Sequence, residues 1–236
     1  MGAMLPPVRQ VFPVPKDDVD PARAYGDDER PGRWLLVNMI SSLDGATAIA
    51  GRSGGLGGPA DKEVFRAIRS VADVILVGAG TVRAENYGPP SVDARLAIVS
   101  ASLRFDPAAR VFKDGYRPIV VTHASTDPAR RAELEAIADV LVAGETRVDL
   151  RAAIAQLSGV ILCEGGPSLN GELIAADLVD ELCLTVAPVL VSGDSSRIAR
   201  GQEPTAVRHM RLARILEADG CLFFRFVRGA SARSAS

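Results

Sequence analysis

The chain has 236 residues, which is enough for one large α/β domain but not for two comfortable ones. Apolar residues make up 47% of it, as in an ordinary globular core, and a net charge of −2 without a basic block argues against a nucleic-acid partner. No apolar run approaches membrane-spanning length and no signal-peptide pattern opens the sequence, so we expect a cytoplasmic protein with no membrane partner.

Residues 1–31 are rich in proline and aspartate, and we expect them to form an extended arm that packs on the domain without joining its sheet. Residues 32–228 form the predicted domain, and the small polar tail 229–236 is expected to fray. Short apolar runs in the domain predict strands at 34–40, 72–77, 96–99, 119–122, 140–142, 160–163 and 182–187. Helices are predicted to begin near residues 61, 128, 149 and 167, and the glycine-rich stretch 51–58 is predicted to be a mobile loop.

This alternation of strands and helices predicts a largely parallel sheet with helices on both faces. The C-terminal part differs, because Asp219-Gly220 separates two apolar runs, 212–216 and 221–227. An Asp-Gly pair in that setting is typical of a β-hairpin. The predicted fold is therefore a mixed, mostly parallel α/β sheet with an antiparallel edge at the C-terminus.

Two of the predicted strands end in glycine-rich turns that lead into helices. Gly78-Ala79-Gly80 follows one strand, and Gly165-Gly166-Pro167 follows another. Proline suits a first helical turn, and the free backbone N–H groups there attract anions that glycine allows to come close. The pattern indicates a phosphate cradle, although turns of this kind are also common where an α/β protein binds nothing.

The usual reactive motifs are missing from the sequence. Arg83 stands where a dinucleotide-binding fingerprint needs its third glycine, and neither a phosphate loop nor a nucleophile elbow is present. The two histidines stand alone, and the three cysteines lie in apolar runs without a Cys-x-x-Cys pair, so we expect no metal site and no disulfide. If the protein is an enzyme, a bound cofactor should carry its chemistry.

Four blocks, in this order along the chain, resemble the reductase domain of bacterial riboflavin biosynthesis, which has the fold of dihydrofolate reductase. They are Ser42-Leu43-Asp44-Gly45, residues 72–82, Glu164-Gly165-Gly166-Pro167 and residues 178–188, within a resemblance that spans about residues 33–227. The resemblance implies a homodimeric, NADPH-dependent enzyme. It would reduce 5-amino-6-(5-phosphoribosylamino)uracil to the ribitylamino form by hydride transfer to C1′ of the ring-opened imine.

The resemblance also implies a set of site residues. Glu85 and Glu164 match carboxylates near the reacting centre, and Glu85 would supply or relay a proton. Arg69 would pair with the substrate phosphate. The other substrate-binding positions are Asn38, Asp44, Ser53 and, again, Glu164. Cofactor contacts would come from Ile40, Gly78, Ala79, Gly80, Thr81, Val82, Ser100, Gly165, Gly166, Pro167, Ser168, Leu169 and Asn170.

The chain departs from the family pattern in its substrate region. The family often has lysine at Asn38, aspartate at Glu85 and proline at Tyr87, and residues 55–57 replace a Trp-Ile-Thr segment. The zinc deaminase that precedes the reductase in bifunctional members is not found, so we expect a stand-alone reductase. Two alternatives stay open: a dihydrofolate or pterin reductase of the same fold, and an NADPH-binding paralogue without turnover. Asp44 could instead only cap a turn.

Overall fold

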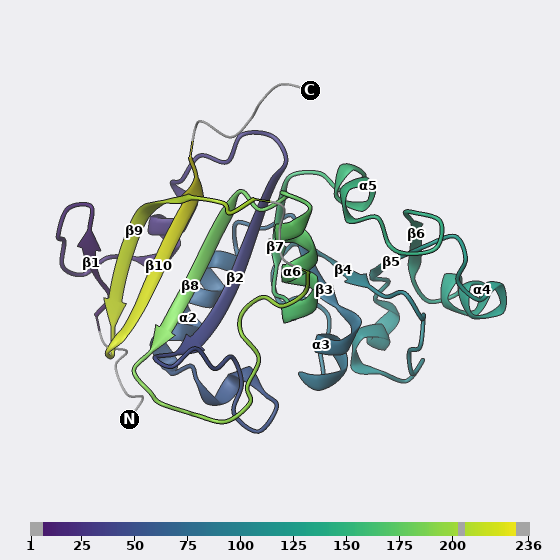
Figure 1. Cartoon of the computed structure of the whole chain (residues 1–236), viewed down its shortest axis with the longest axis horizontal. Coiled ribbons are helices and arrows are strands. Elements are labelled where there is room, and N and C mark those ends of the chain that lie inside the picture. Colours follow the sequence, from purple (N-terminus) through teal and green to yellow (C-terminus); the bar gives the residue numbers. More distant parts are fainter. Residues whose placement is uncertain (1–6, 203–205, 230–236) are drawn as a thin grey trace.

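The computed structural model describes residues 7–202 and 206–229, and its core is a ten-stranded sheet (Figure 1). The strands lie in the order β1-β9-β10-β8-β2-β7-β3-β4-β5-β6. Their bounds are β1 (Arg9–Phe12), β2 (Trp34–Ser42), β3 (Val74–Gly78), β4 (Arg95–Val99), β5 (Ile119–Thr122), β6 (Asp139–Val142), β7 (Val160–Cys163), β8 (Glu181–Ala187), β9 (Met210–Ala218) and β10 (Cys221–Arg228). Neighbours from β8 to β6 pair in parallel, whereas β10 and β1 run antiparallel to their neighbours.

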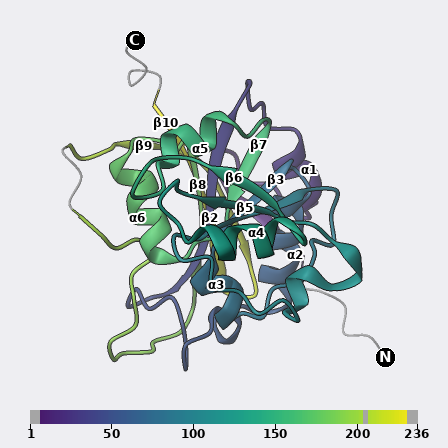
Figure 2. The same cartoon turned by 90° about the vertical axis from the view of Figure 1, so that its right-hand side faces the viewer.

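Helices cover both faces of the parallel part, as the alternation of elements predicts. Figure 2 shows α5 and α6 on one side of the sheet and α1 and α2 on the other. Side chains of β2 alternate accordingly: Leu36 packs into the core beneath α1 and α2, while Leu35 and Val37 pack into the core beneath α5 and α6. The helices are α1 (Pro21–Gly26), α2 (Pro59–Arg69), α3 (Ala79–Ala84), α4 (Pro128–Glu135), α5 (Leu150–Ala155) and α6 (Pro167–Ala175).

Local signals in the sequence fix several of these boundaries. Proline occupies the first helical position of α2, α4 and α6. The side chain of Asp149 accepts a hydrogen bond from Ala152 N and starts α5, as predicted. Asp219 and Gly220 both have positive φ, +54° and +74°, which turns β9 into β10 and confirms the predicted hairpin.

The expectation that residues 1–31 stay outside the sheet is wrong. Residues Arg9–Phe12 form β1, which pairs antiparallel with β9 and is the edge strand of the sheet. A buried cluster holds this segment, because the guanidinium of Arg30 donates to both carboxylate oxygens of Glu181. The antiparallel edge is therefore provided by the N-terminal segment, and the C-terminal hairpin lies one strand further in.

Two further expectations concern loops and ends. The stretch 51–58 contains a short 3-10 turn, Ser53–Gly55, and buries Leu56, so it packs partly against the domain. Its predicted mobility stays a prediction. The predicted frayed tail lies outside the described residues from position 230 onward. Among the helices that the structure describes, none is long and apolar enough to span a membrane.

Candidate active site

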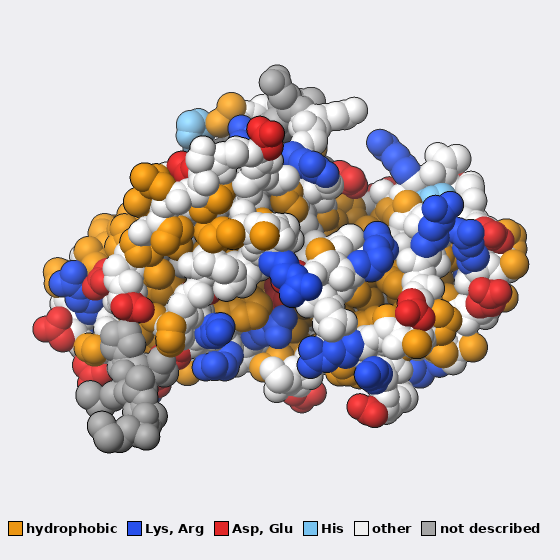
Figure 3. Space-filling model, turned by 90° about the horizontal axis from the view of Figure 1, so that it is seen from below, with side chains coloured by type: hydrophobic (Ala, Val, Ile, Leu, Met, Phe, Trp, Pro, Cys, Tyr) orange, Lys and Arg blue, Asp and Glu red, His pale blue; other side chains and the backbone are white. Residues whose placement is uncertain are grey.

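A cavity of about 770 Å³ opens at the edge of the sheet where the parallel strands end. Its lining residues fall within 38–40, 47–57, 61–65, 80–87, 164–167, 185 and 191–196. Seen from this edge, lysine and arginine side chains gather around a central hollow (Figure 3). The carboxyl ends of parallel strands are the usual position for ligands in α/β sheets. We therefore treat this cavity as the candidate active site.

The two glycine-rich turns meet in the wall of the cavity because β3 and β7 are neighbours. Gly78 N–H donates to Gly165 O at 2.8 Å, and Gly165 has a φ of +86°, a conformation that favours glycine. A Cβ on Gly166 would lie 2.8 Å from Thr81 Oγ1, so only glycine fits without a shift there. A Cβ on Gly80 would meet nothing within 4 Å, which leaves open space above its backbone.

Only part of the predicted cofactor set lines the cavity: Ile40, Gly80, Thr81, Gly166 and Pro167. The side chains of Val82 and Leu169 are buried in the two cores. Three polar side chains of the predicted set bond elsewhere in the protein: Ser100 Oγ accepts from Leu103 N, Ser168 Oγ accepts from Arg200 Nε, and Asn170 Nδ2 donates to Ile198 O. Gly78, Ala79 and Gly165 support the turns without lining the cavity, so cofactor contacts from these eight residues stay predictions.

Arg69, Glu164 and Tyr87 form a hydrogen-bonded group at the cavity wall, which we call the Glu164 cluster. Arg69 Nε and Nη2 each donate to one oxygen of Glu164 at 2.7 Å, and Tyr87 Oη donates to Glu164 Oε2 at 2.7 Å. Burial, followed by the charge of Glu164, raises the pKa of Tyr87, so its hydroxyl stays protonated. Burial alone would lower the pKa of Arg69, but the hydrogen bonds and charge of Glu164, together with Tyr87, outweigh burial and the pKa is raised.

Glu164 and Tyr87 line the cavity, whereas Arg69 does not. The guanidinium of Arg69 lies 4.5 Å from the centre of the Phe65 ring and forms an ion pair with Glu164. The predicted pairing of Arg69 with a substrate phosphate stays a prediction, and it would require this guanidinium to face the cavity.

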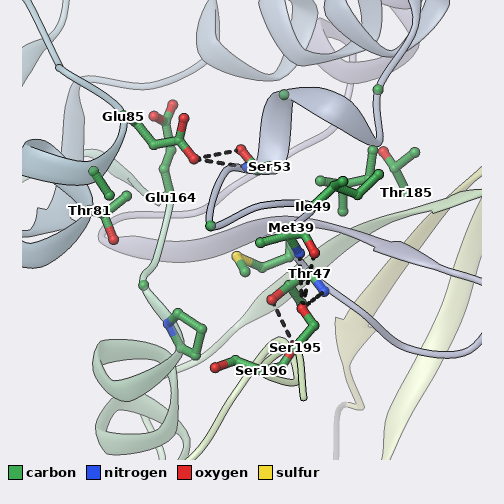
Figure 4. A pocket seen from close by; sticks show the side chains of 18 of the residues that line it. Met39, Thr47, Ile49, Ser53, Thr81, Glu85, Glu164, Thr185, Ser195 and Ser196 are labelled. Carbon is green, nitrogen blue, oxygen red and sulfur yellow. Dashed lines mark hydrogen bonds between the residues drawn. The ribbon is translucent and has the colours of Figure 1, made fainter. Parts of the chain in front are cut away.

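Glu85 holds the glycine-rich loop. Its Oε1 accepts hydrogen bonds from the backbone N of Ser53 at 3.0 Å and from Ser53 Oγ at 3.1 Å, and both residues line the cavity (Figure 4). The sequence placed Glu85 and Ser53 in the site but gave no sign that they bond to each other. A proton-transfer role for Glu85 stays a prediction.

Asp44 lies outside the cavity lining and joins two loops. It accepts from Ser42 Oγ at 2.5 Å and from the backbone N atoms of Val191 and Ser192 at 3.1 and 2.6 Å. These bonds, led by the one from Ser42, lower the pKa of Asp44 to about 2. The geometry fits the turn-capping alternative, so substrate binding by Asp44 stays a prediction. Asn38, in contrast, lines the cavity, and substrate binding by Asn38 stays a prediction.

Sequence reasoning missed several cavity residues. Asp61 and Lys62 lie in the first turn of α2, and Thr185 lies on β8. Thr47 donates through Oγ1 to Ser196 O at 2.8 Å, which ties the loop after β2 to the loop after β8 (Figure 4). Asp61 looks in the sequence like a helix-start residue and Thr185 like an ordinary strand residue. The pairing of β8 with β2 places Thr185 beside Ile40 at the cavity.

Comparison with known proteins identifies this architecture. The family model of the RibD C-terminal domain matches residues 33–222. A reductase from Methanothermobacter thermautotrophicus, named for 2,5-diamino-6-ribosylamino-4(3H)-pyrimidinone 5′-phosphate, is 31% identical over 176 residues, which cover 70% of this chain and 82% of that protein.

Solved structures show the same fold. A pyrimidine reductase-like protein from Corynebacterium diphtheriae superimposes with a TM-score of 0.78 at 23% identity, over 90% of this chain and 100% of that one. Dihydrofolate reductase from Enterococcus faecalis superimposes with a TM-score of 0.50 at 12% identity, over 83% of this chain and 96% of that one. These likenesses confirm the predicted dihydrofolate-reductase-like fold.

Proposed function

The chain belongs to the family of the RibD C-terminal domain, and from that premise we propose that it is an NADPH-dependent reductase of a ribosylaminopyrimidine 5′-phosphate in riboflavin biosynthesis. The reaction would reduce C1′ of the ring-opened imine and leave a ribitylamino group. One relative, 31% identical over 82% of its length, carries the name of such a reductase. The base could be the uracil that the sequence resemblance implies or the diaminopyrimidinone of that name.

The observation that carries this proposal is the meeting of two glycine turns beside the start of α6. Gly80 offers open space at the cavity wall, and Gly166 allows close approach at the first turn of the helix. Free backbone N–H groups at a helix start favour phosphate oxygens. This wall therefore fits the pyrophosphate of a dinucleotide, with Gly80, Thr81, Gly166 and Pro167 as the residues that would contact it.

The protein's own part in the reaction is to hold the cofactor and the substrate and to align their reacting atoms. Bound NADPH would supply the hydride. The cavity residues on β2 would fix the acceptor carbon near it, and most of the rate would come from this positioning. Reduction of the imine adds a hydride to carbon and a proton to nitrogen. Glu85, which lines the cavity, would supply or relay that proton.

The test is consumption of NADPH by purified protein with the diaminopyrimidinone phosphate or with its uracil counterpart as substrate. We expect reduction of at least one of them, and thermal stabilisation by NADPH greater than that by NADH. Glu85→Gln should slow the single-turnover rate, and an unchanged rate would remove Glu85 from the chemistry. Failure to bind NADPH would overturn the proposal.

A pterin reductase is the second candidate, because the fold is shared with dihydrofolate reductase and the loop at 55–57 differs from the family pattern. Dihydrofolate in the same assay tests it. NADPH binding without turnover of any of the three substrates would indicate the non-catalytic alternative.

We also propose that the protein is a homodimer. Alternate residues of β8 and β10, among them Leu184, Phe224 and Phe226, are half-exposed and apolar on the face opposite α1 and α2. In Figure 1 no described helix lies in front of β8, β10 and β9. Apolar patches of this kind mark protein interfaces. Light scattering of the wild type should give twice the mass of one chain, and Phe224→Asp should reduce the measured mass to that of one chain.

A cytoplasmic location remains a prediction as well.

A further inference from the structure

Asp61 is a cavity carboxylate that the proposed function leaves without a role. It lies in the first turn of α2 and lines the cavity together with Thr185 of β8. Thr185 pairs with Ile40 of β2, so Asp61 and the glycine turns lie on opposite sides of the β2 strand end. Figure 4 shows this separation, with Thr185 and Ile49 on one side of the cavity and Thr81 and Glu164 on the other.

The backbone around Asp61 is shaped to accommodate its carboxyl group. A Cβ on Gly57 would overlap Asp61 Oδ2 and lie 3.0 Å from its Cγ. The carboxyl group therefore sits directly against the glycine backbone, where any side chain at position 57 would displace it. The loop that carries Gly57 is the one that replaces the family's Trp-Ile-Thr segment. The altered loop and the acidic residue thus form one local arrangement.

Asp61 is half-buried, and it differs in its partners from Glu164, which is a buried carboxylate of the same cavity. Glu164 is held by an arginine and a tyrosine. Within the described residues, no arginine or lysine forms an ion pair with Asp61. Burial raises the pKa of Asp61 more than the hydroxyl of Thr185 and the charge of Lys62 lower it. The ionised carboxylate is therefore incompletely stabilised, and N–H donors from a ligand would stabilise it further.

The two possible bases differ in the edge that such a carboxylate would meet. A 2-amino-4(3H)-pyrimidinone presents two N–H donors side by side, the ring N3–H and the 2-amino group. A uracil presents N3–H beside a carbonyl oxygen. An ionised carboxylate only accepts hydrogen bonds, and its two oxygens suit a pair of parallel donors. Against uracil, one carboxylate oxygen would face the carbonyl oxygen and be repelled.

We propose that Asp61 reads the base of the substrate by accepting hydrogen bonds from N3–H and the 2-amino group, and so selects the 2-aminopyrimidinone over the uracil. The inference rests on the proposed reductase function. It assigns Asp61 as the specificity-determining residue, with Thr185 and Gly57 as positioning residues that hold its carboxylate.

The test compares kcat/KM for the two substrates in the wild type and in Asp61→Asn. The wild type should prefer the 2-amino substrate by at least about tenfold, because a site built for two donors rejects a partner that lacks one. An amide donates one hydrogen bond and accepts one, which matches the uracil edge. Asp61→Asn should therefore lower the preference at least about tenfold, with the Kd for NADPH unchanged. Glu63→Gln on the same helix, outside the cavity lining, should leave the preference unaltered.

Gly57→Ala provides a second variant that displaces the carboxylate without removing it, and it should weaken the preference in the same direction. Reduction of both substrates with equal efficiency by the wild type would overturn the inference while the reductase function stands. The inference is also overturned, with the reductase function intact, if Asp61→Asn is folded, as judged by its unfolding midpoint, and keeps the wild-type substrate preference. If neither substrate is reduced, the proposed function itself fails and the inference falls with it.

Discussion

Two buried glutamates of this protein are each held by arginine, and they lie in regions with different tasks. Glu181, whose side chain is fully buried, accepts from Arg225 Nε at 2.7 Å and Nη2 at 3.1 Å, from Arg30, and from Trp34 Nε1. Glu164, whose side chain is 3% exposed, accepts from Arg69 and from Tyr87. None of the residues around Glu181 lines the cavity, whereas Glu164 and Tyr87 do.

The comparison shows that the same pairing of side chains can stabilise a fold or shape a site. The Glu181 group joins β8, β10 and β2 to the N-terminal segment that carries β1. The Glu164 cluster joins α2 to β7 and presents a tyrosine hydroxyl to the cavity. Changes in the first region should therefore alter stability, and changes in the second should alter catalysis.

The largest effect is expected for Glu181→Gln. Removing one partner of a buried ion pair leaves unpaired buried charge, so the free energy of unfolding should fall by about 3–5 kcal/mol in urea titrations. The control is Asp139→Asn, which breaks ion pairs whose aspartate is 51% exposed and should cost less than about 1 kcal/mol. Equal costs for the two variants would contradict the assignment of the Glu181 group to the fold.

The pH dependence of this difference has a definite sign. Burial alone would raise the pKa of Glu181, but Arg225 and Arg30 outweigh burial and the pKa is lowered. A lowered pKa means that the ionised glutamate stabilises the fold above the unfolded pKa of about 4.3, and that this stabilisation is lost as the pH falls through the folded value. The stability gap between wild type and Glu181→Gln should therefore narrow below about pH 4.

Glu164→Gln should act on turnover more than on stability. Loss of the Glu164 carboxylate leaves Arg69 without its ion-pair partner, but the Arg69 side chain is 20% exposed and can reach water. We expect kcat/KM to fall by at least about tenfold, or about 1.4 kcal/mol, with a smaller loss of unfolding free energy than in Glu181→Gln. Glu172→Gln, an exposed change on α6, is the control and should alter neither quantity. A stability loss as large as that of Glu181→Gln, with normal turnover of the folded enzyme, would remove the distinction between the regions.

Tyr87→Phe should have a smaller effect, because it removes one hydroxyl and keeps the ring. We expect KM to rise between about twofold and tenfold, the equivalent of one ordinary hydrogen bond. The matched control is Tyr116→Phe, whose hydroxyl accepts from Leu96 N at 2.8 Å away from the cavity and should affect stability instead. Since the pKa of Tyr87 is raised, the activity of the wild type should show no tyrosine ionisation below about pH 10. Equal KM values for the wild type and Tyr87→Phe would exclude a substrate contact.

The sequence predicted much of the fold because the signals for it are local. Apolar runs such as 72–77, whose strand begins at Val74, marked the buried parallel strands, and Asp219-Gly220 marked the hairpin. The segment Arg9–Phe12 escaped notice because it is short, flanked by prolines and stabilised by pairing with a strand near the other end of the chain. Edge strands of that kind depend on a distant partner that no local pattern reveals.

The site was predictable only in part, for the same reason. The two glycine turns could be recognised because each follows a predicted strand, but their meeting depends on the pairing of β3 with β7, which the sequence did not predict. The bonds between Arg69 and Glu164, and between Ser53 and Glu85, join residues that are far apart in the sequence. Family resemblance named these residues as separate ligand contacts, whereas the structure shows that they bond to one another. Asp61 was missed because its burial depends on the loop packed against it.

The smallest effect is expected for Ser53→Ala, which tests a carboxylate contact without an arginine. Both the backbone N and Oγ of Ser53 donate to Glu85 Oε1, so the variant keeps one of the two bonds. We expect about a twofold rise in KM, or roughly 0.5 kcal/mol, with slightly faster amide exchange in residues 51–58. Ser70→Ala, which removes a bond to Ala67 O outside the cavity, is the control and should leave KM unchanged. A rise above tenfold would mean that Ser53 contacts the substrate directly, as the family resemblance implies, and that holding the loop is only part of its role.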